Sequence, residues 1–97
     1  MQITKNQEGE KLTVKVEGRL DTSTAPSLEA ELANLEGVKE MVFDFSGLEY
    51  VSSAGLRVIL ATQKTMSKLG GLTLTGVSDA VMEVFEITGF ADILTIK

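Results

Sequence analysis

The sequence predicts an α/β fold: a mixed, mostly parallel sheet with an N-terminal β-hairpin and crossover helices, in the order β-β-α-β-α-β-α-β. Three observations predict it. Apolar and polar residues alternate near the N-terminus, later stretches have helical periodicity, and short β-prone runs separate them. Because strands that alternate with helices are joined by crossovers, most strand pairs should be parallel. The 97 residues are expected to form one domain over residues 1–97.

The first two strands are expected at residues 1–5 and 12–17. In the second strand, apolar residues alternate with polar ones, which is typical of a half-buried strand. Gly9 and its polar neighbours lie between the two strands and predict a hairpin. Residues 18–23 (GRLDTS) are expected to break the second strand.

A first helix is expected from Thr24 to Gly37. Thr24 is of a type that caps helices, and Pro26 is tolerated in a first turn because its missing N–H would have no partner there. Gly37 is expected to end the helix. Steps of three and four residues predict one apolar stripe, made of Ala25, Leu28, Leu32 and Leu35.

A buried strand and a second helix are expected in the middle of the chain. Residues 41–45 (MVFDF) are short, apolar and β-prone, which is typical of a parallel strand buried on both faces. Residues 46–52 should form a loop, and residues 53–68 a helix that stops at Gly70 and Gly71. The inner side of this helix should hold Leu56, Ile59, Leu60 and Gln63.

The C-terminal third predicts a strand, a helix and a final strand. Residues 72–75 are β-prone, and residues 93–96 should form the last strand. Asp79 is expected to cap the helix between them and Gly89 to end it. The helical spacing is carried by Val81, Val84, Phe85 and Thr88, and the residues expected to pack in the core are Phe85, Ile87 and Phe90.

The composition narrows the classes of function. The chain has no histidine, which is the commonest acid–base catalyst and metal ligand, and no cysteine for thiolate chemistry. A net charge of −5 without a basic cluster disfavours nucleic acid and anionic membranes. No apolar run approaches the ~20 residues that span a bilayer, and the N-terminus does not resemble a secretory signal. We therefore expect a cytoplasmic protein that is not an enzyme and has no cofactor or metal.

The stretch DFSGLEYVSSAGLRVIL at residues 44–60 carries the chemistry. Ser53 stands where the second helix should begin, so its hydroxyl can accept a backbone hydrogen bond. A helix start also presents unpaired N–H groups and partial positive charge, which suit a phosphoryl group. The alternative is that Ser53 is only a cap, and Ser52 could equally be that cap. Gly55 marks either a close backbone approach or only a loosened first turn.

Two carboxylates are further candidates because functional sites in such sheets gather at the carboxyl ends of strands, here residues 18–23 and 46–54. Asp21 either contacts a partner or caps the following turn. Asp44 is either a buried, paired carboxylate near Ser53 or a strand-end residue in water. A Mg²⁺ site or a hydrolytic pair made of Asp21 and Asp44 is disfavoured, because no nucleophile–base pair and no glycine-rich phosphate loop accompany them.

The second helix also carries a stripe of small or β-branched residues. Such a stripe can dock against another protein or cover the neighbouring core, and the second interpretation is favoured for Val58. Arg57 and Lys64 should project from the polar side, either as partner contacts or as solvated charges. The members of the stripe are Ala54, Val58, Ala61 and Thr65.

Three motifs resemble a known family over nearly the whole chain. They are GRLD at residues 18–21, DFSGLEYVSSAGL at residues 44–56 and VFEITGF at residues 84–90, in the right order and at the right separations. On these motifs the chain resembles an anti-sigma factor antagonist, which is a stand-alone STAS domain. The resemblance implies a STAS-like fold that works by binding a partner protein.

The resemblance also implies a phosphorylation site and partners. In the family, an anti-sigma factor that is a serine kinase with a histidine-kinase-like ATPase fold phosphorylates a serine at the start of the second helix, and a PP2C-type phosphatase reverses this. Aligning on Gly55 places that serine at Ser53, with Ser52 as second choice. The family has an aspartate where this chain has Ser52, so that charge is missing. Together with the residues considered above on the second helix, the predicted partner-binding residues are Asp21, Ser52, Ser53, Ala54, Gly55, Arg57, Val58 and Ala61.

The leading functional hypothesis is therefore a binding switch. The unphosphorylated form would bind the anti-sigma factor and so release a sigma factor, and phosphorylation would end that binding. The alternative is a STAS scaffold subunit of a lipid-transport or signalling complex, which would use the same face without phosphorylation. An enzyme such as a nucleotide hydrolase is disfavoured because the chain lacks histidine and a phosphate-binding motif.

Overall fold

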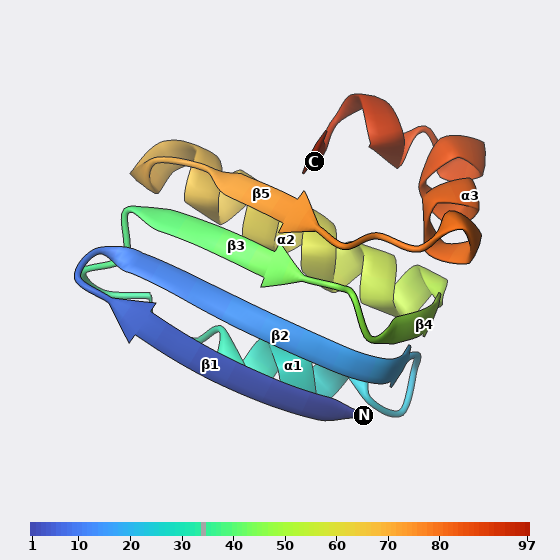
Figure 1. Cartoon of the computed structure of the whole chain (residues 1–97), viewed down its shortest axis with the longest axis horizontal. Coiled ribbons are helices and arrows are strands. Elements are labelled where there is room, and N and C mark those ends of the chain that lie inside the picture. The colour runs from blue at the N-terminus through green and yellow to red at the C-terminus, as the bar shows by residue number, and fades with distance from the viewer. Residues whose placement is uncertain (34) are drawn as a thin grey trace.

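The computed structural model describes residues 1–33 and 35–97 and has the predicted α/β architecture (Figure 1). The predicted order of strands and helices is confirmed, with an additional strand, β4, in a segment expected to be a loop. The elements of the described residues are β1 (Gln2–Glu8), β2 (Lys11–Leu20), α1 (Ala25–Glu31), β3 (Glu40–Asp44), β4 (Leu48–Val51), α2 (Ser53–Leu69), β5 (Leu72–Thr75), α3 (Asp79–Thr88), the 3-10 helix η1 (Phe90–Asp92) and β6 (Thr95–Ile96).

The sheet is mixed and mostly parallel, as predicted. Strands β1 and β2 form an antiparallel hairpin, and the order β1-β2-β3-β5-β6 continues through parallel neighbours. Strand β4 lies off this path and pairs in parallel with the end of β2. The register places Val14 beside Phe43 and Phe43 beside Leu74, so these buried side chains share one face of the sheet.

Helices α1 and α2 cover one face of the sheet, whereas α3 lies beyond the end of the central strands, in contact with β4 (Figure 1). The core lies between these layers, and the rings of Phe43 and Phe45 stack in it with their centroids 5.1 Å apart. The prediction that residues 41–45 are buried on both faces is wrong, because Val42 and Asp44 are only half-buried. Their face of the sheet has no helix of the described residues packed on it.

Strand β2 is longer than predicted. Residues 18–20 continue the strand because they pair with β4, which places Gly18 beside Leu48 and Leu20 beside Val51. The register shifts after Gly18, whose φ of 97° suits the irregular backbone there. The predicted strand break at residue 18 is therefore wrong, and so is a loop throughout residues 46–52.

Helix α1 ends earlier than predicted, at Glu31 instead of Gly37, with Leu32 as the C-cap residue. Asn34, which the predicted helix included, lies outside the described residues. Thr24 is the N-cap residue, but its side chain bonds no N–H of the helix and instead accepts the Asp21 N–H over 2.8 Å. The predicted stripe still packs on the core through Ala25, Leu28, Leu32 and Leu35.

Helix α2 agrees closely with its prediction. It runs from Ser53 to Leu69, and Gly70 follows as the C-cap residue. A side chain at Gly70 would collide with the backbone carbonyl of Lys39, which explains a glycine there. The inner side of α2 buries Leu56, Ile59 and Met66, whereas Leu60 and Gln63 are half-buried.

Among residues 1–33 and 35–97, no helix has the length and apolar character needed to traverse a membrane.

The C-terminal segment departs from its prediction in three places. Ser78, not Asp79, caps α3, because its hydroxyl accepts a backbone N–H of the first turn over 3.3 Å. Gly89 ends the helix in the left-handed conformation, as predicted, but η1 follows, so only Thr95–Ile96 form β6. The prediction that Ile87 packs in the core is wrong, since Ile87 lies on the solvent side of α3 and is 77% exposed.

Candidate functional site

The candidate site lies where the ends of β2 and β4 meet. The backbone N–H of Ser52 donates a hydrogen bond to the carbonyl oxygen of Leu20 over 2.9 Å, which extends the pairing of Leu20 with Val51 by one step. The loop after β2 and the start of α2 are therefore neighbours at one edge of the sheet, as the parallel arrangement predicted.

The first turn of α2 separates the roles of its two serines. Ser52 is the N-cap residue with an extended backbone, and its hydroxyl accepts the Gly55 N–H over 3.4 Å. Ser53 is the first helical residue, is exposed, and makes no side-chain hydrogen bond with the described residues. The alternative in which Ser53 is the cap is thus wrong. The Ser53 hydroxyl is accessible, and the first turn contains no acidic residue.

Gly55 sets how closely α2 approaches β2. A Cβ atom at Gly55 would lie 2.7 Å from Cγ of Leu20 and 3.0 Å from its carbonyl oxygen, closer than such atoms normally come. Of the two interpretations left open for Gly55, the close backbone approach is the one found. Gly55 is itself buried, so it positions the first turn instead of presenting a side chain.

The Asp21 carboxylate is held within its own turn. Its Oδ1 atom accepts hydrogen bonds from the Ser23 hydroxyl at 2.7 Å, the Ser23 N–H at 3.0 Å and the Thr24 N–H at 3.2 Å. The hydrogen bond from the Ser23 hydroxyl is the main cause that lowers the pKa of Asp21 below its ordinary value of 3.8. Asp21 therefore stabilises the turn that leads into α1, and its second oxygen lies 4.0 Å from the Arg19 guanidinium.

Asp44 also belongs to a turn and has no described bond to Ser53. Its Oδ1 atom accepts the Ser46 N–H over 3.0 Å at the end of β3. This bond is the main cause that lowers the pKa of Asp44 below 3.8, and the positive charge of Lys15 adds to it. Asp44 is half-buried at a strand end, so the interpretation as a buried carboxylate paired near Ser53 is wrong.

Arg19 and Tyr50 form a contact at this edge that the sequence did not predict. The two residues are register partners of β2 and β4, and the Arg19 guanidinium lies 4.3 Å from the centre of the Tyr50 ring. Both are exposed, Tyr50 by 39%. Arginine and tyrosine are enriched at protein interfaces. The pair was missed because β4 itself was missed.

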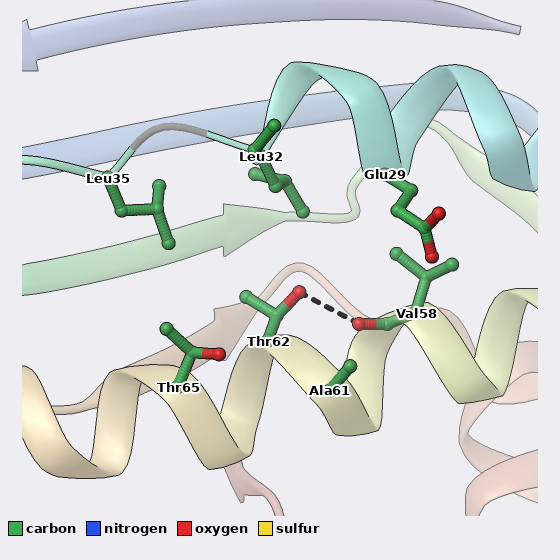
Figure 2. Close-up of a pocket in the computed structure, with 8 residues that line it drawn as sticks. Glu29, Leu32, Leu35, Val58, Ala61, Thr62 and Thr65 are labelled. Carbon is green, nitrogen blue, oxygen red and sulfur yellow. Dashed lines mark hydrogen bonds between the residues drawn. The ribbon is translucent and has the colours of Figure 1, made fainter.

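The stripe predicted on α2 lines a groove between α1 and α2 (Figure 2). The groove has a volume of about 320 Å³. Val58 is only 7% exposed and belongs to the core, as was favoured, but it also forms part of the groove wall. Ala54 is half-buried at the N-terminal end of the same stripe. The lining residues are Glu29, Leu32, Ala33, Leu35, Val58, Ala61, Thr62 and Thr65.

The predicted site residues thus fall into three groups. The first, at the surface, contains Ser53, Arg57 and Ala61. The second, half-buried around the first turn of α2 and the end of β2, contains Asp21, Ser52 and Ala54. The third, buried beneath them, contains Gly55 and Val58.

Comparison with known proteins agrees with this architecture. Residues 3–95 match the family described as "Mlab, STAS domain". The chain belongs to the STAS domain family. BtrV of Bordetella bronchiseptica, provisionally named an anti-sigma factor antagonist, is 37% identical over 99% of this chain and 85% of its own. The anti-sigma-B factor antagonist of Staphylococcus aureus is 34% identical over 87% of this chain and 81% of its own.

A solved structure confirms the STAS fold. An anti-sigma factor antagonist from Mycobacterium paratuberculosis superposes with a TM-score of 0.86 at 24% identity, covering 98% of this chain and 83% of that protein. The resemblance inferred from the three sequence motifs is therefore confirmed. The relatives are named as regulators and not as enzymes, in agreement with the prediction of a non-enzymatic protein.

Proposed function

We propose that this STAS protein is an anti-sigma factor antagonist whose unphosphorylated form binds an anti-sigma factor and releases a sigma factor. The anti-sigma factor would be a serine kinase with a histidine-kinase-like ATPase fold that phosphorylates Ser53, and a PP2C-type phosphatase would restore binding. The names of relatives at 37% and 34% identity support the assignment to antagonists. A protein that acts on these partners would work in the cytoplasm.

The observation that carries the proposal is the free, exposed hydroxyl of Ser53 in the first turn of α2. Because Ser52 already caps the helix, modification of the Ser53 hydroxyl removes no hydrogen bond to residues 1–33 or 35–97. A phosphoryl group there adds about −1.5 to −2 charges and lies at the positive end of the helix dipole. The fold can therefore accept the modification without rearrangement.

Phosphorylation would block binding through charge and desolvation. A partner surface packed against Ser53 must exclude water, and burying a doubly negative group without new partners is strongly unfavourable. The proposed contact surface extends from Ser53 along α2 and onto the turn after β2, and it includes Asp21, Ala54, Arg57 and Ala61.

The test combines mass spectrometry with calorimetry. The native protein should carry an addition of about 80 Da on Ser53 in part of its population. Ser53→Ala should bind the purified anti-sigma factor kinase and resist release by ATP, whereas Ser53→Asp should lose binding. Ser67→Ala, which alters another exposed serine of α2, is the control and should behave as the unaltered protein. Unchanged affinity of both Ser53 variants would contradict the proposal.

The second candidate function is a scaffold subunit that uses the same face without phosphorylation. Ser52 in place of the family aspartate favours it, since the charge next to the phosphorylated serine is missing. A native protein that is never phosphorylated, but that copurifies stoichiometrically with a transport complex, would support the scaffold and contradict the switch.

A further inference from the structure

The groove between α1 and α2 is lined mainly by apolar side chains and is open to solvent. Leu32 and Leu35 point into it from one side and Ala61 from the other (Figure 2). The Thr62 hydroxyl donates to the Val58 carbonyl over 2.8 Å, so it is already satisfied within α2. The groove therefore offers mainly apolar surface to an occupant, as do grooves that receive one face of an amphipathic helix.

The two edges of the groove carry opposite charge. On the α1 edge, the Glu29 side chain points across the groove towards Val58 (Figure 2). On α2, Arg57, Lys64 and Lys68 are exposed at spacings of seven and four residues, which place them on one side of the helix. Arg57 precedes the groove residue Ala61 by four positions and Lys64 follows it by three, so this basic side of α2 borders the groove and forms its α2 edge. Within residues 1–33 and 35–97, the ion pairs join other residues and leave these four charges unpaired.

We propose that this groove is the second part of the docking surface for the anti-sigma factor and receives one amphipathic helix of that partner. The helix would place aliphatic side chains against Leu32, Leu35 and Ala61. Lysine or arginine on one flank would face Glu29, and aspartate or glutamate on the other would face the basic edge of α2. The opposite charges of the two edges select this occupant and fix its orientation. The inference rests on the proposed function and identifies the partner element that binds.

The groove is continuous with the phosphorylation site. Ser53 precedes Arg57 by four residues and therefore lies on the basic edge of α2, in line with Lys64. A phosphoryl group on Ser53 would put negative charge where the acidic flank of the bound helix begins. Repulsion between these like charges explains how one modification at the end of α2 acts on a contact that extends along the helix.

The experiment is a calorimetric titration with the purified anti-sigma factor kinase that phosphorylates Ser53. Ala61→Arg fills the groove from an exposed position and should weaken binding about tenfold or more. Glu29→Lys reverses the charge of the α1 edge and should also weaken binding, whereas Ala80→Arg, at an exposed site on α3, should not. Circular dichroism establishes that each variant is folded. If one groove variant fails to fold, the affinity of the other one still tests the proposal.

A photo-crosslinker at Thr65, an exposed residue of the groove, identifies the occupant. The crosslinked peptide should be a helix of the kinase with aliphatic residues at helical spacing and the two charged flanks described. Binding of both groove variants as tight as that of Ala80→Arg would overturn the groove proposal alone. A crosslink to a second copy of this chain, or to a kinase segment without those charges, would also overturn it. Failure of the unaltered protein to bind the kinase would instead overturn the proposed function.

Discussion

Ser52 and Leu20 join the two loops of the site, because the Ser52 N–H donates to the Leu20 carbonyl over 2.9 Å. The same Ser52 caps α2 through its hydroxyl, and Gly55 allows the helix to press against Leu20. One residue thus pairs as a continuation of β4 and starts the helix. These contacts hold the start of α2 in place, and Ser53 is the accessible residue next to Ser52.

Replacement of Ser52 by alanine should destabilise the protein, while replacement of Ser53 should not. Ser52→Ala removes the side chain that accepts the Gly55 N–H and should lower the free energy of unfolding by about 1 kcal/mol. Ser53→Ala removes no hydrogen bond made with the described residues and should change it by less than about 0.5 kcal/mol. Urea denaturation followed by circular dichroism measures both values.

Ser52→Asp is the matched control for that experiment, since aspartate is an equally good N-cap and favours the positive helix end. It should retain the stability of the unaltered protein. Equal destabilisation by Ser52→Ala and Ser53→Ala would show that the hydroxyl of Ser52 is not the cap in solution.

Gly55→Ala should destabilise the protein although alanine favours helices. The new methyl group would approach Cγ of Leu20 to 2.7 Å and the Leu20 carbonyl to 3.0 Å, and the backbone oxygen cannot move without breaking its bond to Ser52. We expect a net loss of about 1–3 kcal/mol, as for other overpacked sites. Thermal and urea unfolding provide the measurement.

Ala61→Gly, at an exposed position in the interior of α2, separates packing from helix propensity. It should cost about 1 kcal/mol through propensity. If Gly55→Ala were instead stabilising, the helix would not press against Leu20 as the structure has it, and the role assigned to Gly55 would fail.

The central strands could be predicted from the sequence because their signal is local. In β2, Leu12, Val14 and Val16 are buried and their neighbours are not, which the alternation of residue types reports directly. Strand β4 could not be predicted in this way. Its two end residues are buried and the two between them are exposed, so no alternation is present. It is a strand because residues distant in sequence, at the end of β2, pair with it.

The candidate site was predicted in position but not in its details. Ser53 was located because helix starts have a local chemistry, but both serines are acceptable caps by type. The backbone decides between them, and it is Ser52 that is extended, with ψ of 175°.

Ile87 was misplaced for a geometric reason. It follows the buried Phe85 by two residues, which turns it to the opposite side of α3.

Acid should weaken the turn that Asp44 stabilises. The Ser46 N–H holds the pKa of Asp44 below the value of 3.8 that it has when unfolded. A lowered pKa in the folded state contributes stability above the unfolded pKa, and that contribution is lost as the pH falls through the folded pKa. Asp44→Asn should therefore remove part of the decline in unfolding free energy that occurs as the pH falls below about 4.

Ser46→Ala is the control for Asp44, because it keeps the backbone N–H that is the main cause of the lowered pKa. In this variant the pKa of the Asp44 carboxyl, followed by carbon NMR, should remain below 3.8, but the shift should be smaller than in the unaltered protein. A titration of Asp44 at its ordinary value in the unaltered protein would contradict the hydrogen bond.

Arg57 should lower the second pKa of a phosphoryl group on Ser53. The two residues are four apart on α2 and both exposed, a spacing that brings side chains together on one face of a helix. The guanidinium favours the doubly ionised phosphate, so the pKa should fall below its ordinary value of about 6. Arg57→Gln should raise it again, and Lys68→Gln, about three turns further along α2, should leave it unchanged. Phosphorus NMR of protein with phosphoserine installed at position 53 measures each titration. Identical curves for the unaltered protein and Arg57→Gln would mean that Arg57 does not reach the phosphate, and that the modification acts on the partner through its own charge alone.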